Sequence, residues 1–181
     1  QYYSRLALYP LLVVNVVIAF SLPTSNIYAF GSGIKDGHAP LSALTFADKL
    51  NIDGTLINSY PFGGYINWAD PRRKVFIDGR VNQLYTPEFH NNYLDLMENA
   101  SSWSSNEKQW GFDYGIFEYN SQSIDNRHFP AHLNHNSEWV LVYWDTHSTI
   151  YVKRIPRFES LIAKYEYKLA KPSFNQFDYL A

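Results

Sequence analysis

The sequence predicts an α/β protein with one N-terminal transmembrane helix followed by a layered domain. Three observations lead to this prediction. The chain opens with 17 residues that carry no charge, Leu6 to Leu22. Short apolar runs then alternate with segments of helical spacing. Two closing apolar runs around a polar turn indicate a C-terminal β-hairpin, so we expect a mixed, partly parallel sheet.

Composition limits the classes of function. A chain of 181 residues fits one domain of ordinary size with an appendage. Charged and aromatic residues each make up 18%, which excludes intrinsic disorder. The net charge of −2 gives no electrostatic basis for binding nucleic acid. Because the chain has no Cys, disulfides, zinc–thiolate sites and thiol catalysis are excluded.

The uncharged stretch lies at the short end of the lengths that cross a bilayer. Arg5 precedes it and the next basic residue is Lys35, a bias that places the N-terminus in the cytoplasm. Pro10 and Asn15 are tolerated in a span when neighbouring helices satisfy the freed polar groups. We therefore expect both residues to take part in membrane or complex docking.

This interpretation assigns residues 1–22 to a single-pass helix of the inner (cytoplasmic) membrane, with the soluble domain on the periplasmic side. A buried core helix is the alternative. A signal peptide is a weaker alternative, because residues 21–30 offer a poor small-residue cleavage pattern.

The following elements are predicted in chain order. Residues 23–39 are rich in Gly, Pro, Ser and Asn, which is typical of a linker. Helical spacing from Leu41 predicts a short helix that ends near Leu50. Thr55 to Ile57 form the core of a strand. The segment 63–69, GGYINWA, predicts a helix that begins at its two glycines.

Three further apolar segments complete the predicted domain. The run KVFID at 74–78 has the pattern of a strand buried on both faces, and YGIFEY at 114–119 repeats it. Residues 89–103 place Phe89, Tyr93, Leu96 and Met97 on one helical face. A hairpin over 137–154 and an amphipathic helix over 157–171 follow. The α/β domain is thus expected over 40–170, with a tail at 171–181.

Polar residues follow two of the predicted strands. Asn58 and Tyr60 come after the first, and Asp78 and Arg80 come after KVFID. Ligands of open α/β sheets bind beyond the carboxyl ends of the strands, so we expect these residues at a ligand or partner contact. The alternative is that Asp78 and Arg80 only pair with each other.

The segment between these strands adds four candidates. Gly63 and Gly64 would let another backbone approach closely and would expose amide groups at a helix start. Tyr65 and Trp68 supply flat apolar faces that stack on sugar rings or sit at an interface. The alternative is that the two aromatic rings fill the core.

No metal or cofactor site is expected. His128, His132 and His135 would share a face of a continuous helix, but Pro130 argues against such a helix. Neither a nucleophile elbow nor a phosphate-binding glycine loop occurs in the sequence.

Three separated segments carry a family resemblance. Residues 39–50, 57–85 and 139–158 together resemble the C-terminal extracytoplasmic domain of bacterial polytopic membrane proteins of the glycosyltransferase-like, lipid-phosphate-sugar-dependent (GT-C) type. The shared pattern is an Asn, a Gly-Gly-Tyr turn, Phe-Ile-Asp-Gly-Arg and a closing hairpin. The resemblance implies that Asn58, Tyr65, Asp78 and Arg80 contact a saccharide or position a loop, and that Trp68 stacks or anchors.

Two functions follow. The first is a non-catalytic accessory or scaffold subunit of a larger membrane complex, derived from a glycosyltransferase-like protein. The alternative is the acceptor-side domain of a GT-C glycosyltransferase of which this chain is a fragment. Such enzymes carry their catalytic acids between early membrane helices, so we expect no activity from this chain alone. The expected partners are membrane-protein subunits, the lipid bilayer, and a saccharide or lipid-linked sugar.

Overall fold

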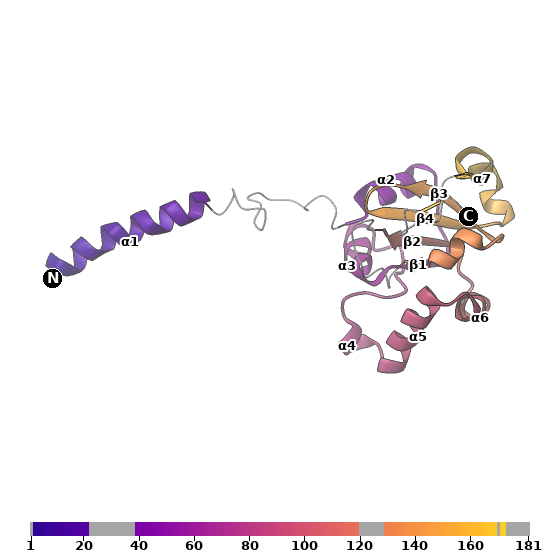
Figure 1. The fold of residues 1–181 in the computed structure, drawn as a ribbon, viewed down its shortest axis with the longest axis horizontal. Helices are drawn as coiled ribbons and strands as arrows, with labels where there is room; N and C mark the ends of the chain where they lie inside the picture. The colour runs from indigo at the N-terminus through magenta and orange to yellow at the C-terminus, as the bar shows by residue number, and fades with distance from the viewer. Residues whose placement is uncertain (1, 22–38, 120–128, 170, 173–181) are drawn as a thin grey trace. The chain divides into compact units, whose positions relative to one another are not determined.

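The computed structural model describes residues 2–21, 39–119, 129–169, 171 and 172 (Figure 1). The chain divides into two compact units, residues 1–36 and 37–181. The predicted linker lies almost wholly outside the described residues, and so do His128 and most of the predicted tail.

The first unit holds helix α1 (Tyr2–Ser21). Its Leu and Val side chains between Leu11 and Val17 are 45–63% exposed. Pro10 lies inside the helix. The Asn15 side-chain amide donates to the Leu11 carbonyl at 2.8 Å, so its donor is satisfied within the helix.

The prediction that this segment is a transmembrane helix is wrong. Among the residues that the structure describes, no helix has the length and apolar character needed to cross a membrane. The physical reason lies in the sequence: the uncharged stretch was already short for a span, and Pro10 and Asn15 interrupt its apolar run. The predicted single-pass location in the inner membrane depended on this helix and is wrong for the same reason.

The second unit is built on a four-stranded mixed sheet in the order β1-β2-β4-β3. The strands are β1 (Leu56–Asn58), β2 (Tyr114–Glu118), β3 (Trp139–Trp144) and β4 (Ser148–Lys153). Strands β1 and β2 run parallel, whereas β2–β4 and β4–β3 are antiparallel. This domain is mixed α/β, and its closing strands form the hairpin that the sequence indicates.

Apolar cores fill both faces of the sheet, because successive side chains of a strand point to opposite faces. Ile116, Ile150 and Val152 face one core, which α2 (Leu41–Lys49), α3 (Tyr60–Ala69) and α7 (Glu159–Tyr165) cover. Phe117 and Tyr151 face the other, covered by α5 (Pro87–Glu98), α6 (Ala100–Trp110) and the 3-10 helix η2 (Ala131–His135). Figure 1 shows α2 and α5 on opposite sides of the strands. The short helices α4 (Val81–Leu84) and η3 (Pro156–Phe158) lie in the connections.

Local sequence signals fix several helix ends. Helix α2 ends at a left-handed Asn51 (φ 53°), after which the Ile52 amide bonds back to the Ala47 carbonyl at 2.8 Å. At the start of α5 the Thr86 hydroxyl accepts from the Phe89 amide, and Pro87 takes the first helical position. Helix α6 ends at Gly111 in the left-handed region.

Four predicted elements differ from the structure. The helix predicted over residues 89–103 is two helices, α5 and α6, which meet at the extended Asn99. The run 74–78 is not a strand, because Asn58 and Gly63 hold it beside β1 and α3 by contacts other than a backbone ladder. Helix α3 begins at Tyr60, where Pro61 suits the first turn, so the two glycines lie inside the helix rather than at its start. The last helix ends at Tyr165, well before residue 171.

Gly63 is required by close packing. A Cβ at this position would lie 2.0 Å from the Ile77 carbonyl oxygen and 2.8 Å from the Asp78 Cα. Both are backbone atoms, which cannot rotate away as a flexible side chain would. At Gly64, by contrast, an added Cβ would meet nothing within 4 Å.

These neighbouring glycines provide a matched pair of substitutions. Gly63→Ala should lower the free energy of unfolding by about 3 kcal/mol, because the methyl group would push residues 77 and 78 off the helix. Gly64→Ala should raise it by about 0.5–1 kcal/mol, because alanine restricts the unfolded chain and suits a helix. Urea denaturation followed by tryptophan fluorescence measures both. Equal effects of the two changes would contradict this packing.

Candidate functional site

Asn58 lies at the carboxyl end of β1, and its buried amide is used inside the fold. Its Oδ1 accepts from the Phe76 amide at 2.8 Å, and its Nδ2 donates to the carbonyls of Ile77 (2.8 Å) and Ser59 (2.9 Å). One side chain thus binds a backbone donor and a backbone acceptor of the neighbouring segment, as a paired strand would. We call this arrangement the Asn58 clamp.

Ser59 and Tyr60 continue the same edge. The Ser59 hydroxyl accepts from the Glu118 amide at 2.8 Å, which joins the ends of the two parallel strands. The Tyr60 amide donates to the Tyr93 hydroxyl at 2.8 Å. Burial of Tyr93 raises the pKa of its phenol. The half-buried Tyr60 ring contacts His90 edge to face, with centroids 6.2 Å apart. Ser59 was not predicted, since a serine after a strand is a common turn residue.

The remaining candidates on α3 divide between the interior and the surface. Gly63 is buried against residues 77 and 78, whereas Gly64 faces open space. The half-buried Tyr65 packs on the core, and its ring centroid lies 5.6 Å from that of Trp68. Trp68 is 72% exposed. Trp68 therefore fills no core position.

Asp78 and Arg80 pair with each other, and only one of them is buried. Asp78 is 3% exposed. Its carboxylate accepts from the Arg80 backbone amide at 2.9 Å and from Nε at 3.0 Å, and Nη2 of Arg80 lies 2.5 Å from its other oxygen. These hydrogen bonds lower the pKa of the Asp78 carboxyl. The Arg80 side chain is 54% exposed.

A pocket of about 600 Å³ opens at the amino ends of β1 and β2, opposite the predicted site. Arg73 is buried in its wall, where its Nη groups bond Asp48 (2.6 Å), the Ile52 carbonyl (2.7 Å) and the Tyr114 hydroxyl (2.8 Å). Arg72 binds Asp70, and this hydrogen bond lowers the pKa of the Asp70 carboxyl. The basic run 72–74 thus contributes two of its charges to internal ion pairs.

One surface was not anticipated from the sequence. Rings from the coil before Asp78, from the bend after α4 and from helices α5 and α6 meet there in successive contacts. Because each ring belongs to a different segment, the pattern of no single stretch of sequence predicts this surface. We call it the aromatic patch, and it consists of Phe76, Leu84, Tyr85, Phe89 and Trp110.

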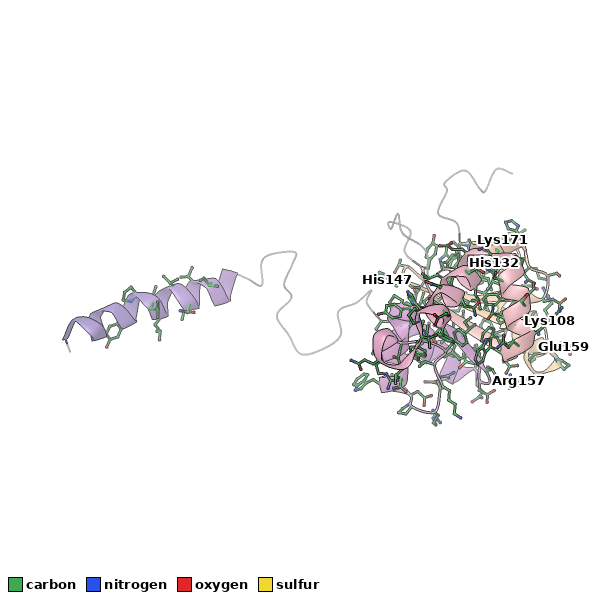
Figure 2. All side chains as sticks on the ribbon, turned by 90° about the horizontal axis from the view of Figure 1, so that it is seen from below. Lys108, His132, His147, Arg157, Glu159 and Lys171 are labelled. Atoms are coloured by element: carbon green, nitrogen blue, oxygen red, sulfur yellow. The ribbon has the colours of Figure 1, made fainter. Side chains whose placement is uncertain are left out.

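Of the two described histidines of this group, His132 serves packing. His132 (labelled in Figure 2) is half-buried in η2. Its Nε2 lies 3.1 Å from the Leu96 carbonyl oxygen, and its ring packs edge to face on Trp103. His135 is exposed. Over the described ranges, no three His, Asp or Glu side chains are placed to hold a metal ion.

No family model, no curated protein and no solved structure matches this chain.

The Asn58 clamp predicts a position-specific effect of charge. Asn58→Asp keeps the acceptor toward Phe76 but replaces the donor with an oxygen that faces the carbonyls of residues 59 and 77. We expect the free energy of unfolding to fall by about 2–4 kcal/mol, because a buried carboxylate would lack donors. Asn67→Asp on the exposed face of α3 is the control, with a change within about 0.5 kcal/mol. Urea denaturation measures the unfolding free energy of both variants. Equal losses in the two variants would contradict the Asn58 clamp.

His132 predicts a pH dependence of stability. Its Nε2–H donates to Leu96, and the buried Nδ1 has no hydrogen-bond partner in the described structure. Burial lowers the pKa of His132 below its ordinary value of 6.5. The unfolded chain therefore binds a proton first as the pH falls through about 6.5, so stability should decline below that pH by at most about 1.4 kcal/mol per pH unit.

The measurement is the difference in unfolding free energy between the wild type and His132→Gln from pH 8 to pH 5. Glutamine keeps a donor toward the Leu96 carbonyl and does not titrate, so the other histidines cancel in the difference. A flat difference across this range would show that His132 does not couple protonation to folding.

Proposed function

We propose that this chain is a non-catalytic accessory or scaffold subunit of a larger protein assembly, with a domain derived from a glycosyltransferase-like protein. The observation that carries this proposal is the internal use of the most distinctive segment, residues 58–80. The Asn58 amide bonds to the backbone of the segment beside β1. Gly63 packs against the backbone of residues 77 and 78, and the Asp78 carboxylate accepts hydrogen bonds from Arg80. A catalytic site would require polar groups that face a substrate.

Helix α1 supports an assembly role. Its exposed side chains at positions 11–14, 16 and 17 are Leu and Val, and they lie around the helix rather than along one stripe. A helical stretch with apolar side chains on all sides is normally covered in the interior of a larger structure. Partner subunits that pack on α1 would provide this cover, and Pro10 and Asn15 would lie within the contact.

The alternative function is the acceptor-side domain of a lipid-phosphate-sugar-dependent glycosyltransferase. One observation favours it: Trp68 is exposed beside the half-buried Tyr65 on α3, and flat rings of this kind can stack on a sugar. Under this alternative, the chain would bind an oligosaccharide acceptor, and Trp68→Ala would abolish that binding while leaving assembly intact.

The scaffold proposal predicts that α1 holds the chain in its assembly. The native particle should have a mass several-fold above 21.1 kDa and contain other proteins in fixed ratio. Val13→Gln combined with Val17→Gln places two amides on one face of α1 and should release the chain, because amides cannot replace buried apolar contacts. Native mass spectrometry of the particle purified through a tag on the chain provides the measurement.

Leu169→Gln is the matched control, since Leu169 is an exposed apolar residue of the second unit. It should leave the particle intact. A wild-type chain that occurs alone in its native source, or a double variant that stays in the particle, would contradict the proposal.

A further inference from the structure

The aromatic patch is a rigid surface that the fold leaves partly open. Tyr85 and Phe89 stack with centroids 5.1 Å apart and planes 18° apart. Phe76 contacts Phe89 at 5.2 Å and Trp110 at 5.4 Å, and the buried Phe112 lies behind it at 5.1 Å. These contacts fix the rings, so a partner that covers them would order few side chains on binding.

Two members of the patch face solvent although they are large and apolar. Leu84 is 59% exposed and Trp110 is 42% exposed. Exposed apolar groups that gather on a surface mark a contact for another molecule more often than single exposed ones do. Trp110 contacts the fixed rings and Leu84 directly precedes Tyr85 in the chain, which indicates a docking surface rather than loose packing.

Arg80 stands at the border of the patch. Its carbonyl accepts from the Leu84 amide at 2.9 Å, so Arg80 and Leu84 are one helical turn apart. Tyr85 follows directly. Burial raises the pKa of the Tyr85 phenol, the Asp78 carboxylate adds to this rise and the Arg80 guanidinium opposes it.

The geometry of Arg80 leaves one binding edge open. A guanidinium has a side edge, formed by Nε and one Nη, and an end edge, formed by its two Nη groups. Asp78 occupies the side edge through Nε and Nη2. Among the described residues Asp78 is the only hydrogen-bond partner of the Arg80 side chain, so the donors of the end edge point away from it.

The buried carboxylate also holds the guanidinium in place. Asp78 accepts from the Arg80 backbone as well as from its side chain, which locks the Asp-Gly-Arg turn. A guanidinium donates only, and its planar edge matches a carboxylate in a bidentate pair. A fixed end edge is thus prepared for an anionic acceptor at little cost in conformational entropy.

We propose that the aromatic patch and Arg80 form a docking surface for an acidic peptide segment of a partner protein. A carboxylate of the segment binds the end edge of Arg80, and adjacent apolar side chains cover Leu84, Tyr85 and Trp110. This inference rests on the proposed scaffold function and names the chemistry of one partner. Arg, Trp and Tyr are the residues that dominate binding energy at protein interfaces.

Charge complementarity favours a peptide over the other anions. Nucleic acid requires several phosphate-binding cations, whereas this surface presents one oriented guanidinium on a chain of net charge −2. The apolar part of the surface exceeds what a small free anion could cover. A segment that carries one carboxylate beside apolar side chains uses both parts of the surface.

The experiment selects peptides from a random 12-residue displayed library on the full chain and measures the Kd of the enriched peptides by fluorescence anisotropy. We expect enriched sequences with Asp or Glu next to apolar residues. Arg80→Gln should weaken their binding at least tenfold, and so should amidation of the acidic side chain in the peptide. Leu84→Ser, which alters no core residue, should weaken binding at least fivefold.

Arg72→Gln is the matched control. Arg72 is an exposed arginine that binds the carboxylate two residues before it, Asp70, through Nε, Nη2 and its backbone amide, as Arg80 binds Asp78. It lies away from the patch, in the wall of the amino-end pocket. Its replacement should change the Kd by less than twofold. The circular dichroism and thermal unfolding of each variant show whether it folds.

Three outcomes would overturn the inference. They are the absence of any enriched peptide, equal effects of Arg80→Gln and Arg72→Gln, and binding of an uncharged oligosaccharide at the patch in place of the peptide. Val13→Gln with Val17→Gln should leave peptide binding unchanged. Failure of the scaffold function at α1 and failure of this surface are therefore separable.

Discussion

The Asn58 clamp is the interaction on which the rest of the second unit depends. Strand β1 is the outer strand of the sheet, and only three residues long. Without a neighbour on its free side it would expose backbone groups next to two apolar cores. The Asn58 amide supplies a donor and an acceptor to residues 76 and 77, and Gly63 lets the same segment lie against α3. This arrangement positions Phe76 in the aromatic patch and places Asp78 where it pairs with Arg80.

The sequence allowed much of the fold to be predicted, because most elements have a local signal. The apolar runs at β2 and in the hairpin, the helical spacing of α2 and α5, and the turn at Asp145 are each readable within a few residues. KVFID was predicted wrongly as a strand because its apolar pattern matches one. What decides its structure is a side chain 18 residues earlier, and periodicity carries no information about such a contact.

The candidate site could be predicted only in part, because sequence patterns carry no information about contacts between distant segments. Residues 58–80 are indeed unusual, but several of their special features serve the chain itself rather than a ligand. Arg73 illustrates the difference: in sequence it belongs to a basic cluster, and in the structure it is buried among Asp48, Asp70 and Tyr114. The aromatic patch could not be foreseen, since its rings come from four segments. The transmembrane helix was predicted because residues 6–22 carry no charge. Pro10 and Asn15 lie in this stretch and lower its apolar character.

The clamp has a further consequence for solubility. The open side of an outer strand is a template onto which a second molecule can add its own strand, and proteins protect such edges to avoid polymerising. At β1 the protection is a single amide side chain with the segment it holds. At the opposite margin of the sheet, the Tyr167 amide bonds to the Leu141 carbonyl of β3 at 3.0 Å. Both margins of this small sheet are thus closed by short pieces of the same chain, and damage to either closure would favour intermolecular strand addition over simple unfolding.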